Sequence, residues 1–244
     1  PFQNRGIDSI VNEKSSKTKL IGFFSFQRIQ FRRVSAHVIY LYDNIITKIE
    51  NFNFAENLTH LYLQNNRIQK LENIEACPKL QKLYLGGNQI QVLEGLDKCP
   101  YLTEIYIENQ HLPDGEKLVF EPRTLQCLSR VLGKKKANRF VYFILFFLEI
   151  LNISGNNLDS LSELSCLESL QELSASNNNL ENIRELVQLI SIWTRLKRLD
   201  TSRNPLCSKA RYRERLIVVS PTLGSTQLSS FDKKKTTTTK LFYL

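Results

Sequence analysis

The chain has 244 residues, a formal net charge of +9 at pH 7 and five cysteines. Its length allows one or two globular domains. It has no signal-peptide pattern, and its longest apolar run, residues 140–148, is too short to span a bilayer. Because of this short run, we expect no membrane contact. The cysteines are odd in number and show no metal-ligand spacing, so we expect a reducing, cytoplasmic compartment.

The positive charge is concentrated in three segments. Residues 11–36, 133–147 and 225–244 carry net charges of +5, +4 and +3, so the remaining residues sum to −3. A high isoelectric point is typical of proteins that bind nucleic acid. Here the excess lies outside the periodic part of the chain, and we therefore expect no nucleic-acid partner.

The first 35 residues contain a partial repeat followed by an aperiodic insert. Residues 2–10 place Phe2, Ile7 and Ile10 in the apolar positions of the repeat described below, and residues 11–35 then interrupt it. Because the chain begins with Pro1 and contains no methionine, we expect it to be a fragment or an incomplete gene product.

Residues 36–206 are dominated by a phrase that recurs at a fixed interval. Written L-x-x-L-x-L-x-x-N-x-I-x-x-L, it occupies residues 58–71 and 80–93, an offset of 22 residues, with related copies before and after. Such a period predicts a repeat architecture. The alternating apolar residues predict a short strand in each repeat, and neighbouring repeats stack these strands into one parallel sheet.

A polar amide follows each predicted strand. We expect it to turn the chain and to satisfy backbone groups that would otherwise be buried without a partner. One position has glutamine, whose longer side chain can do part of the same task. These residues, called the amide ladder below, are Asn44, Asn66, Asn88, Gln110, Asn156, Asn178 and Asn204.

Two stretches between repeats predict helices. Residues 116–132 place Leu118, Leu125 and Leu128 on one face, and residues 186–193 have a similar apolar spacing. Trp193, the single tryptophan, is predicted to belong to the core of the convex side rather than to a binding site. Residues 133–147 lie between these helices and have no period that fits a helix or a strand.

The C-terminal part predicts a cap and a tail. Residues 207–224 are expected to cover the last repeat, whose core edge would otherwise face water. The Lys- and Thr-rich residues 225–244 predict a disordered tail.

Because residues 11–35, 133–147 and 225–244 break the pattern abruptly, we hypothesise that they are read-through of retained introns. Genuine surface insertions are the alternative.

Four tyrosines recur at the repeat interval and form the main candidate site. Tyr40, Tyr62, Tyr84 and Tyr106, called the tyrosine ladder below, each lie between the two core residues of a predicted strand. They are therefore expected to point out of the concave sheet face and to span roughly 14 Å. Exposed aromatic side chains are good anchors for a protein partner. The alternative is that the rings stack and only stiffen the sheet.

Further polar residues are expected on the same face beside the tyrosine ladder. They change the surface from aromatic to charged along the sheet. These candidates are His60, Lys82, Glu104 and Glu108, and then Asn152, Glu172, Ser174, Arg198, Asp200 and Arg203.

Catalysis finds little support in the sequence. The three histidines, His37, His60 and His111, have no nucleophile at a suitable spacing, and there is no phosphate-binding glycine loop or metal cluster. We expect no enzymatic activity, no cofactor and no metal.

With these features in place, the chain resembles the 22-residue class of leucine-rich repeat proteins, which includes regulatory subunits of protein phosphatase 1. The resemblance covers most of residues 36–132 and 148–223. It implies an α/β fold of about seven to eight repeats in a right-handed horseshoe, with a concave parallel sheet, a helical or 3-10 convex side and a C-terminal cap. It is carried by LYDN, ENLTHLYLQNN, KLYLGGNQI, IENQHLPDGEKLVFEPRTLQCLS, LNISGNN and NPLCSKARYRERLIVVS.

The same resemblance implies a function. It points to a non-enzymatic adaptor that binds the catalytic subunit of protein phosphatase 1 through its concave face. It also implies association with microtubules, centrosomes and motor proteins in the cytoplasm and cytoskeleton of developing sperm. Two alternatives stay open: an axonemal or centrosomal scaffold that does not bind the phosphatase, and a spliceosomal-type repeat protein that binds a protein–RNA complex.

Overall fold

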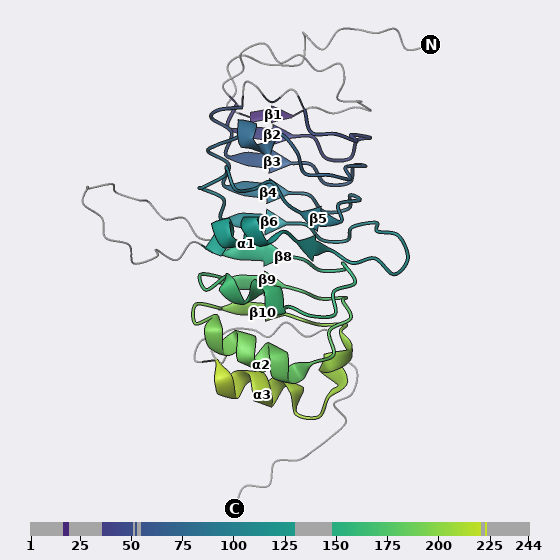
Figure 1. The fold of residues 1–244 in the computed structure, drawn as a ribbon, viewed down its shortest axis with the longest axis vertical. Coiled ribbons are helices and arrows are strands. Elements are labelled where there is room, and N and C mark those ends of the chain that lie inside the picture. The colour runs from purple at the N-terminus through teal and green to yellow at the C-terminus, as the bar shows by residue number, and fades with distance from the viewer. Residues whose placement is uncertain are drawn as a thin grey trace, which may run out of the picture.

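A computed structural model of the chain describes residues 17–19, 36–50, 52, 55–129, 148–220 and 223. Short parallel strands stack into one sheet, in the order β1-β2-β3-β4-β6-β8-β9-β10 (Figure 1). The strands are β1 (Lys17–Lys19), β2 (Val38–Tyr40), β3 (His60–Tyr62), β4 (Lys82–Tyr84), β6 (Glu104–Tyr106), β8 (Ile150–Asn152), β9 (Glu172–Ser174) and β10 (Arg198–Asp200).

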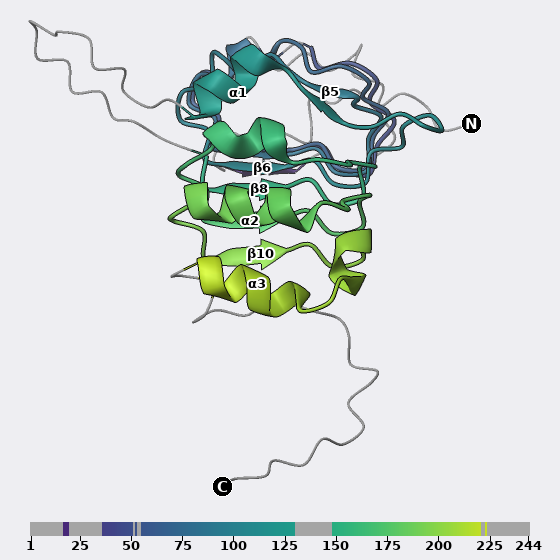
Figure 2. The ribbon, with the colours of Figure 1, turned by 60° about the horizontal axis from the view of Figure 1, so that its bottom comes forward.

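Helices, 3-10 turns and a second small sheet connect these strands. Strands β5 (Val92–Leu93) and β7 (Val119–Phe120) pair in parallel beside the main sheet. Helix α2 (Ile183–Ile192) and helix α3 (Tyr212–Val219) lie next to each other at the C-terminal end of the stack (Figures 1 and 2). The remaining elements are η3 (Ile74–Ala76), α1 (Pro122–Ser129), η4 (Ser162–Cys166) and η5 (Pro205–Ser208).

The core follows the predicted alternation. From β2 to β10 the middle residue of each three-residue strand is buried and the two flanking residues face outward. Leu61 pairs in register with Leu83, and Leu83 with Ile105, so identical repeat positions form continuous apolar rows. Each fully buried aliphatic side chain contributes roughly 1.5–3 kcal/mol. The repeated phrase thus places one row of hydrophobic contacts along the whole stack.

The amide ladder satisfies backbone groups at the strand ends, as predicted, and in addition connects consecutive repeats. Asn178 Nδ2 donates to the carbonyl oxygens of Ala175 and Ile153 at 3.0 and 3.1 Å, one in its own repeat and one in the preceding repeat. Its Oδ1 accepts from the backbone N–H groups of Asn156 and Leu158 at 2.9 and 3.0 Å. Gln110 takes over both tasks: its Oε1 accepts from a backbone N–H and its Nε2 donates to backbone carbonyls.

The residue before each ladder amide has a left-handed backbone. Its φ lies between 53° and 68° in all seven cases, a region that glycine and asparagine tolerate best. Gly87 and Asn177 therefore suit their positions, whereas Arg203 occupies the same conformation with a side chain that disfavours it. These residues are Asp43, Asn65, Gly87, Asn109, Gly155, Asn177 and Arg203.

The predicted helix over 116–132 was wrong at its start. Residues 119 and 120 form β7 instead, and helix α1 begins at Pro122. Proline lacks a backbone N–H and is well suited to the first turn of a helix, whereas Val119 and Phe120 favour a strand. Leu118, Leu125 and Leu128 are buried as expected.

The second helix and the cap match their predictions more closely. Trp193 is fully buried directly after α2, and its indole N–H donates to the Leu164 carbonyl at 3.2 Å. Helix α3 packs against α2 and η5 with Leu216 buried, and Leu223 is also buried. In the described part of the chain, no helix is both long enough and apolar enough to cross a membrane.

The aperiodic segments fall largely outside the described residues. This applies to the partial repeat at 2–10, the insert at 133–147 and the tail at 225–244, so the hypothesis of intron read-through also stays a hypothesis. One part differs from expectation. Lys17–Lys19, within a segment predicted to break the repeat, pairs in parallel with β2 and extends the sheet by a strand.

Replacement of a ladder amide should destabilise the repeats strongly. Asn178→Ala leaves the buried N–H groups of Asn156 and Leu158 without acceptors, and we expect a loss of about 3 kcal/mol in the free energy of unfolding. Urea unfolding followed by far-UV circular dichroism measures it. Asn179→Ala is the matched control, because this neighbouring side chain is exposed. Equal unfolding midpoints for the two variants would contradict a structural role for the ladder.

Candidate functional site

The four residues of the tyrosine ladder stack on one another along the outward face of the sheet. Ring centroids are 4.6 Å apart for Tyr40 and Tyr62, and 4.2 Å apart for Tyr62 and Tyr84. Tyr84 and Tyr106 follow at 4.5 Å with an interplanar angle of 6°. All four rings are partly buried. The structure thus brings together the side chains that the sequence placed in one row, and it also shows the stacking of the alternative interpretation.

Burial and neighbouring groups raise the pKa of two of these phenols, Tyr84 and Tyr106. Burial raises the pKa of Tyr106 to about 12, helped by the negative charge of Glu104 and by a hydrogen bond that Tyr106 Oη donates to Glu104 Oε2 at 3.1 Å. Burial also raises the pKa of Tyr84, with a further contribution from its hydrogen bond to Tyr62. Tyr84 and Tyr106 are therefore neutral at physiological pH, and the ladder offers aromatic surface with hydroxyl groups.

Strands β4, β6, β9 and β10 each begin with a charged residue beside the outward face. Lys82 Nζ lies 2.8 Å from Glu104 Oε1, and Arg198 Nη1 lies 3.1 Å from Glu172 Oε1. Burial, followed by the charge of Lys82, lowers the pKa of His60, so this imidazole is neutral at pH 7. The predicted charges at these positions largely neutralise one another across neighbouring strands.

Unlike Lys82 and Glu104, the predicted site residue Glu108 has no ion-pair partner in the described residues. Its carboxylate extends over Gly86, where a Cβ atom would lie only 2.5 Å from Glu108 Oε1. Glu108 Oε2 is buried and has no hydrogen-bond partner, and the same holds for Gln64 Oε1 in the corresponding position two repeats earlier. Burial raises the pKa of Glu108. Two acceptor oxygens at this repeat position are thus buried without a hydrogen-bond partner, and the space beside Gly86 is filled by the Glu108 carboxylate.

The aromatic part of the face ends at β6. The tyrosine position continues as Asn152, Ser174 and Asp200 in the next three strands. Asp200 Oδ1 accepts from the backbone N–H of Ser202 at 2.9 Å, and no cation lies within ion-pair distance of it in the described residues. Arg203 occupies a turn position after β10. The face is thus aromatic over β2 to β6 and polar over β8 to β10.

Sequence reasoning missed Gln64 and Tyr42. Both occupy the same repeat position as Glu108, one residue after the outer core residue of the strand. Tyr42 makes an edge-to-face contact with Tyr40 at 6.3 Å. The repeat interval that located Glu108 would have located both, because Tyr42, Gln64, Gly86 and Glu108 follow one another at intervals of 22 residues.

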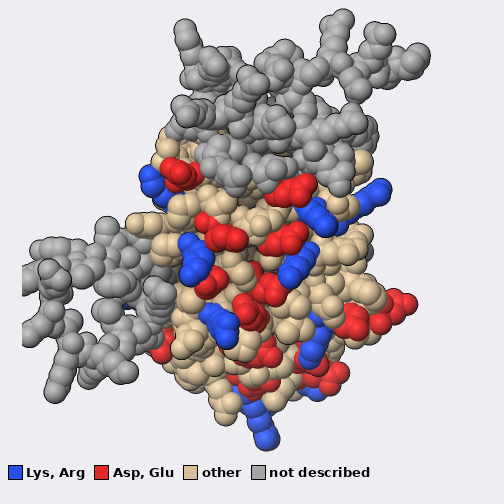
Figure 3. Space-filling view, turned by 45° about the horizontal axis from the view of Figure 1, so that its top comes forward, with Lys and Arg blue, Asp and Glu red and all other residues tan. Residues whose placement is uncertain are grey.

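Within the described residues we find no site for a reactive thiol or for metal binding. Cys77 and Cys99 occupy one repeat position and are buried, and burial raises the pKa of each thiol to about 12. Within the described ranges no group of three His, Cys, Asp or Glu residues is placed to hold a metal ion. Figure 3 shows a face on which acidic and basic side chains are interspersed, without a continuous block of either sign.

The position of Glu108 predicts an unusual effect on stability. Its pKa is raised above the ordinary 4.5, so the folded state disfavours the ionised form at neutral pH. Glu108→Gln should therefore raise the thermal midpoint at pH 7, and the gain should shrink as the pH falls toward 4.5, where the wild-type carboxyl is protonated. Glu104→Gln is the control and should not stabilise, because Glu104 pairs with Lys82. If Glu108→Gln instead lowers the thermal midpoint at pH 7, this assignment is contradicted.

Comparisons with known proteins agree with the repeat fold described above. Residues 56–93 match the protein family described as Leucine Rich repeats (2 copies). An internalin from Listeria monocytogenes is similar in structure, with a TM-score of 0.55 and 22% sequence identity over 74% of this chain and 45% of that chain. A leucine-rich repeat protein from Leptospira interrogans gives a TM-score of 0.51 and 21% identity, over 80% of this chain and 49% of that chain.

This chain therefore spans about half the length of either structure. At these identities the likeness concerns the fold. The recurring phrase, the parallel sheet that it forms and these matches together show that the chain has a leucine-rich repeat fold.

Proposed function

We propose that the chain is a non-enzymatic, protein-binding adaptor that contacts its partner through the tyrosine ladder and the neighbouring Glu108 carboxylate. The observation that carries this proposal is the row of four stacked, partly exposed tyrosines on one sheet face. Tyrosine is enriched at protein interfaces because it combines a large apolar area with a polar tip.

Preordering of the rings favours binding over a purely structural role. The rings are held by strands that are fixed in register, so a partner does not have to immobilise them on binding. The usual cost of ordering an interfacial side chain, about 0.5–1.5 kcal/mol, is thereby reduced for each tyrosine. Stacking and binding are in this way compatible properties of the same row.

The charges of the face indicate the kind of group that a partner presents. Lys82 and Arg198 are paired within the face, whereas Glu108 and Asp200 have no cation within ion-pair distance in the described part of the chain. A lysine or arginine of the partner can pair with the carboxylate of the half-buried Glu108. Arginine can in addition pack over the tyrosine rings, which attract cations.

The partner that we propose is the catalytic subunit of protein phosphatase 1, with association to microtubules, centrosomes and motor proteins. This choice rests on the resemblance of the repeats and the cap to phosphatase regulatory subunits of the 22-residue class. An axonemal or centrosomal scaffold without phosphatase contact is the second candidate, because the tyrosine face suits any partner with exposed basic and apolar groups. A spliceosomal-type role is third.

Binding to the purified phosphatase catalytic subunit tests this proposal. We expect the double variant Tyr62→Ala/Tyr84→Ala to weaken binding by at least about tenfold, since central aromatic residues carry much of the energy of an interface. Glu108→Gln should also weaken binding while raising stability, which separates a role in binding from one in folding. Surface plasmon resonance with the full chain measures both affinities.

The matched control is Tyr101→Ala, which removes an exposed tyrosine outside the ladder and should leave the affinity unchanged. Circular dichroism must show that the double variant is folded, and Tyr62→Phe/Tyr84→Phe keeps the stacked rings. Phosphatase affinity that survives the double alanine substitution contradicts the proposed face. No phosphatase binding with retained tubulin binding favours the scaffold, and salt-sensitive RNA binding favours the spliceosomal-type role.

A further inference from the structure

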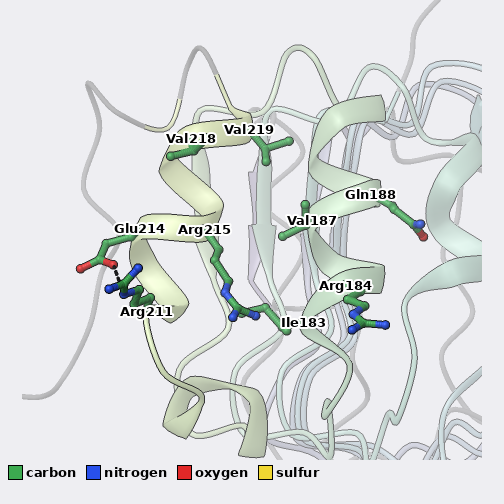
Figure 4. Close-up of a pocket in the computed structure, with 9 residues that line it drawn as sticks. All are labelled: Ile183, Arg184, Val187, Gln188, Arg211, Glu214, Arg215, Val218 and Val219. Carbon is green, nitrogen blue, oxygen red and sulfur yellow. Dashed lines mark ion pairs between the residues drawn. The ribbon is translucent and has the colours of Figure 1, made fainter.

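A second surface lies at the C-terminal end of the stack, away from the tyrosine face. Helices α2 and α3 border an open groove of about 640 Å³ (Figure 4). Val187 of α2 and Val219 of α3 point toward one another across it, and Arg215 extends from α3 toward Ile183. The remaining lining residues are Arg184, Gln188, Arg211, Glu214 and Val218.

Helix α3 has apolar residues on more sides than its packing requires. Residues 216–219 are four consecutive aliphatic residues, and at about 100° per residue they cannot all face the core. Leu216 is buried, whereas Ile217 is 44% exposed and Val218 is 85% exposed. Of the six exposed large hydrophobic residues in the described chain, three belong to α2 and α3: Ile192, Ile217 and Val218.

The charges around this apolar strip are mainly positive. Three arginines line the groove together with a single acidic residue, Glu214. Glu214 Oε2 lies 3.9 Å from Arg211 Nε, and both side chains are largely exposed. In the described residues neither Arg184 nor Arg215 has a carboxylate within ion-pair distance. An occupant that brings aliphatic side chains and carboxylates would satisfy both features.

We infer that this groove is a docking site for an acidic amphipathic helix of another protein. A helix laid along two others buries its apolar stripe between them. Helix α2 has ten residues and is about 15 Å long, so it can accompany about three turns of a bound helix. Aliphatic residues of the bound helix would cover Val187, Val218 and Val219, and its flanking Asp or Glu residues would reach Arg184 and Arg215. This inference does not depend on the proposed partner of the tyrosine face.

A random peptide library tests the chemistry directly. Phage-displayed peptides of about 16 residues are selected on the full chain, and the enriched sequences are synthesised with a fluorescent label. We expect aliphatic residues at positions i, i+3, i+4 and i+7 flanked by Asp or Glu, and affinity that falls as salt rises. Arg184→Glu/Arg215→Glu should weaken binding at least about tenfold in fluorescence anisotropy, and Val218→Asp should remove it.

Two controls locate the peptide site. Arg67→Glu reverses an exposed charge elsewhere on the repeats and should leave peptide affinity unchanged. Tyr62→Ala/Tyr84→Ala should also leave it unchanged, which separates this groove from the tyrosine face. All altered groove residues are exposed, so their substitution should not prevent folding.

Three results would overturn the inference. The first is a failure to enrich peptides of acidic amphipathic character. The second is an affinity that the double arginine reversal leaves unchanged. The third is concentration-dependent self-association in sedimentation velocity that Val218→Asp abolishes, because the groove would then be covered by a second copy of this chain.

Discussion

The structure depends on the need to satisfy backbone polar groups at the end of every strand. Asn88 shows how this is met: its Nδ2 donates to the carbonyls of Leu63 and Leu85, one in each of two consecutive repeats, and its Oδ1 accepts from Ile68 N. Because the same carbonyl of Leu63 also accepts from Asn66, each amide is tied to the next. A repeat that shifted by one residue would leave these buried groups without partners, at a cost of about 1–3 kcal/mol each. The ladder therefore fixes the register on which the rest of the fold is built.

The register of the strands in turn determines how the tyrosine rings of the candidate site lie relative to one another. Parallel strands lie about 4.8 Å apart, which is close to the separation that stacked aromatic rings adopt. Tyrosines at one repeat position therefore stack at 4.2–4.6 Å without distortion of the sheet. The same geometry places Gln64, Gly86 and Glu108 in line, and the missing side chain of Gly86 lets the Glu108 carboxylate lie over the backbone. An apolar residue at position 108 would pack there without a desolvated charge. The Glu108 carboxylate therefore lowers the stability of the folded chain at neutral pH.

Features that repeat could be predicted from the sequence, and features that occur once could not. The buried row containing Leu61 and Leu83, the amide ladder and the outward tyrosines all follow from period and alternation. The start of α1 depends on one proline and on the pairing of Val119 and Phe120 with β5, and that pairing is a tertiary contact. Likewise, Lys17–Lys19 pairs with β2 although its segment lacks the apolar phrase, because an exposed strand edge accepts any backbone. The unpaired oxygens of Gln64 and Glu108 depend on how individual side chains lie, as Glu108 does over Gly86, and no spacing rule describes that.

The two proposed surfaces differ in ways that suit an adaptor. The tyrosine ladder and the α2–α3 groove share no residue: the tyrosines belong to strands β2 to β6, whereas residues 183–219 line the groove beside α2 and α3 at the C-terminal end of the stack (Figure 2). Occupancy of one surface therefore does not block the other. Their unpaired charges are also opposite, with Glu108 and Asp200 on the sheet face and Arg184 and Arg215 beside the groove. A segment suited to one surface would be repelled by the other, and such repulsion is how a protein with two binding sites keeps its partners distinct. A chain whose repeats are rigidly registered can in this way hold two partners at a fixed separation.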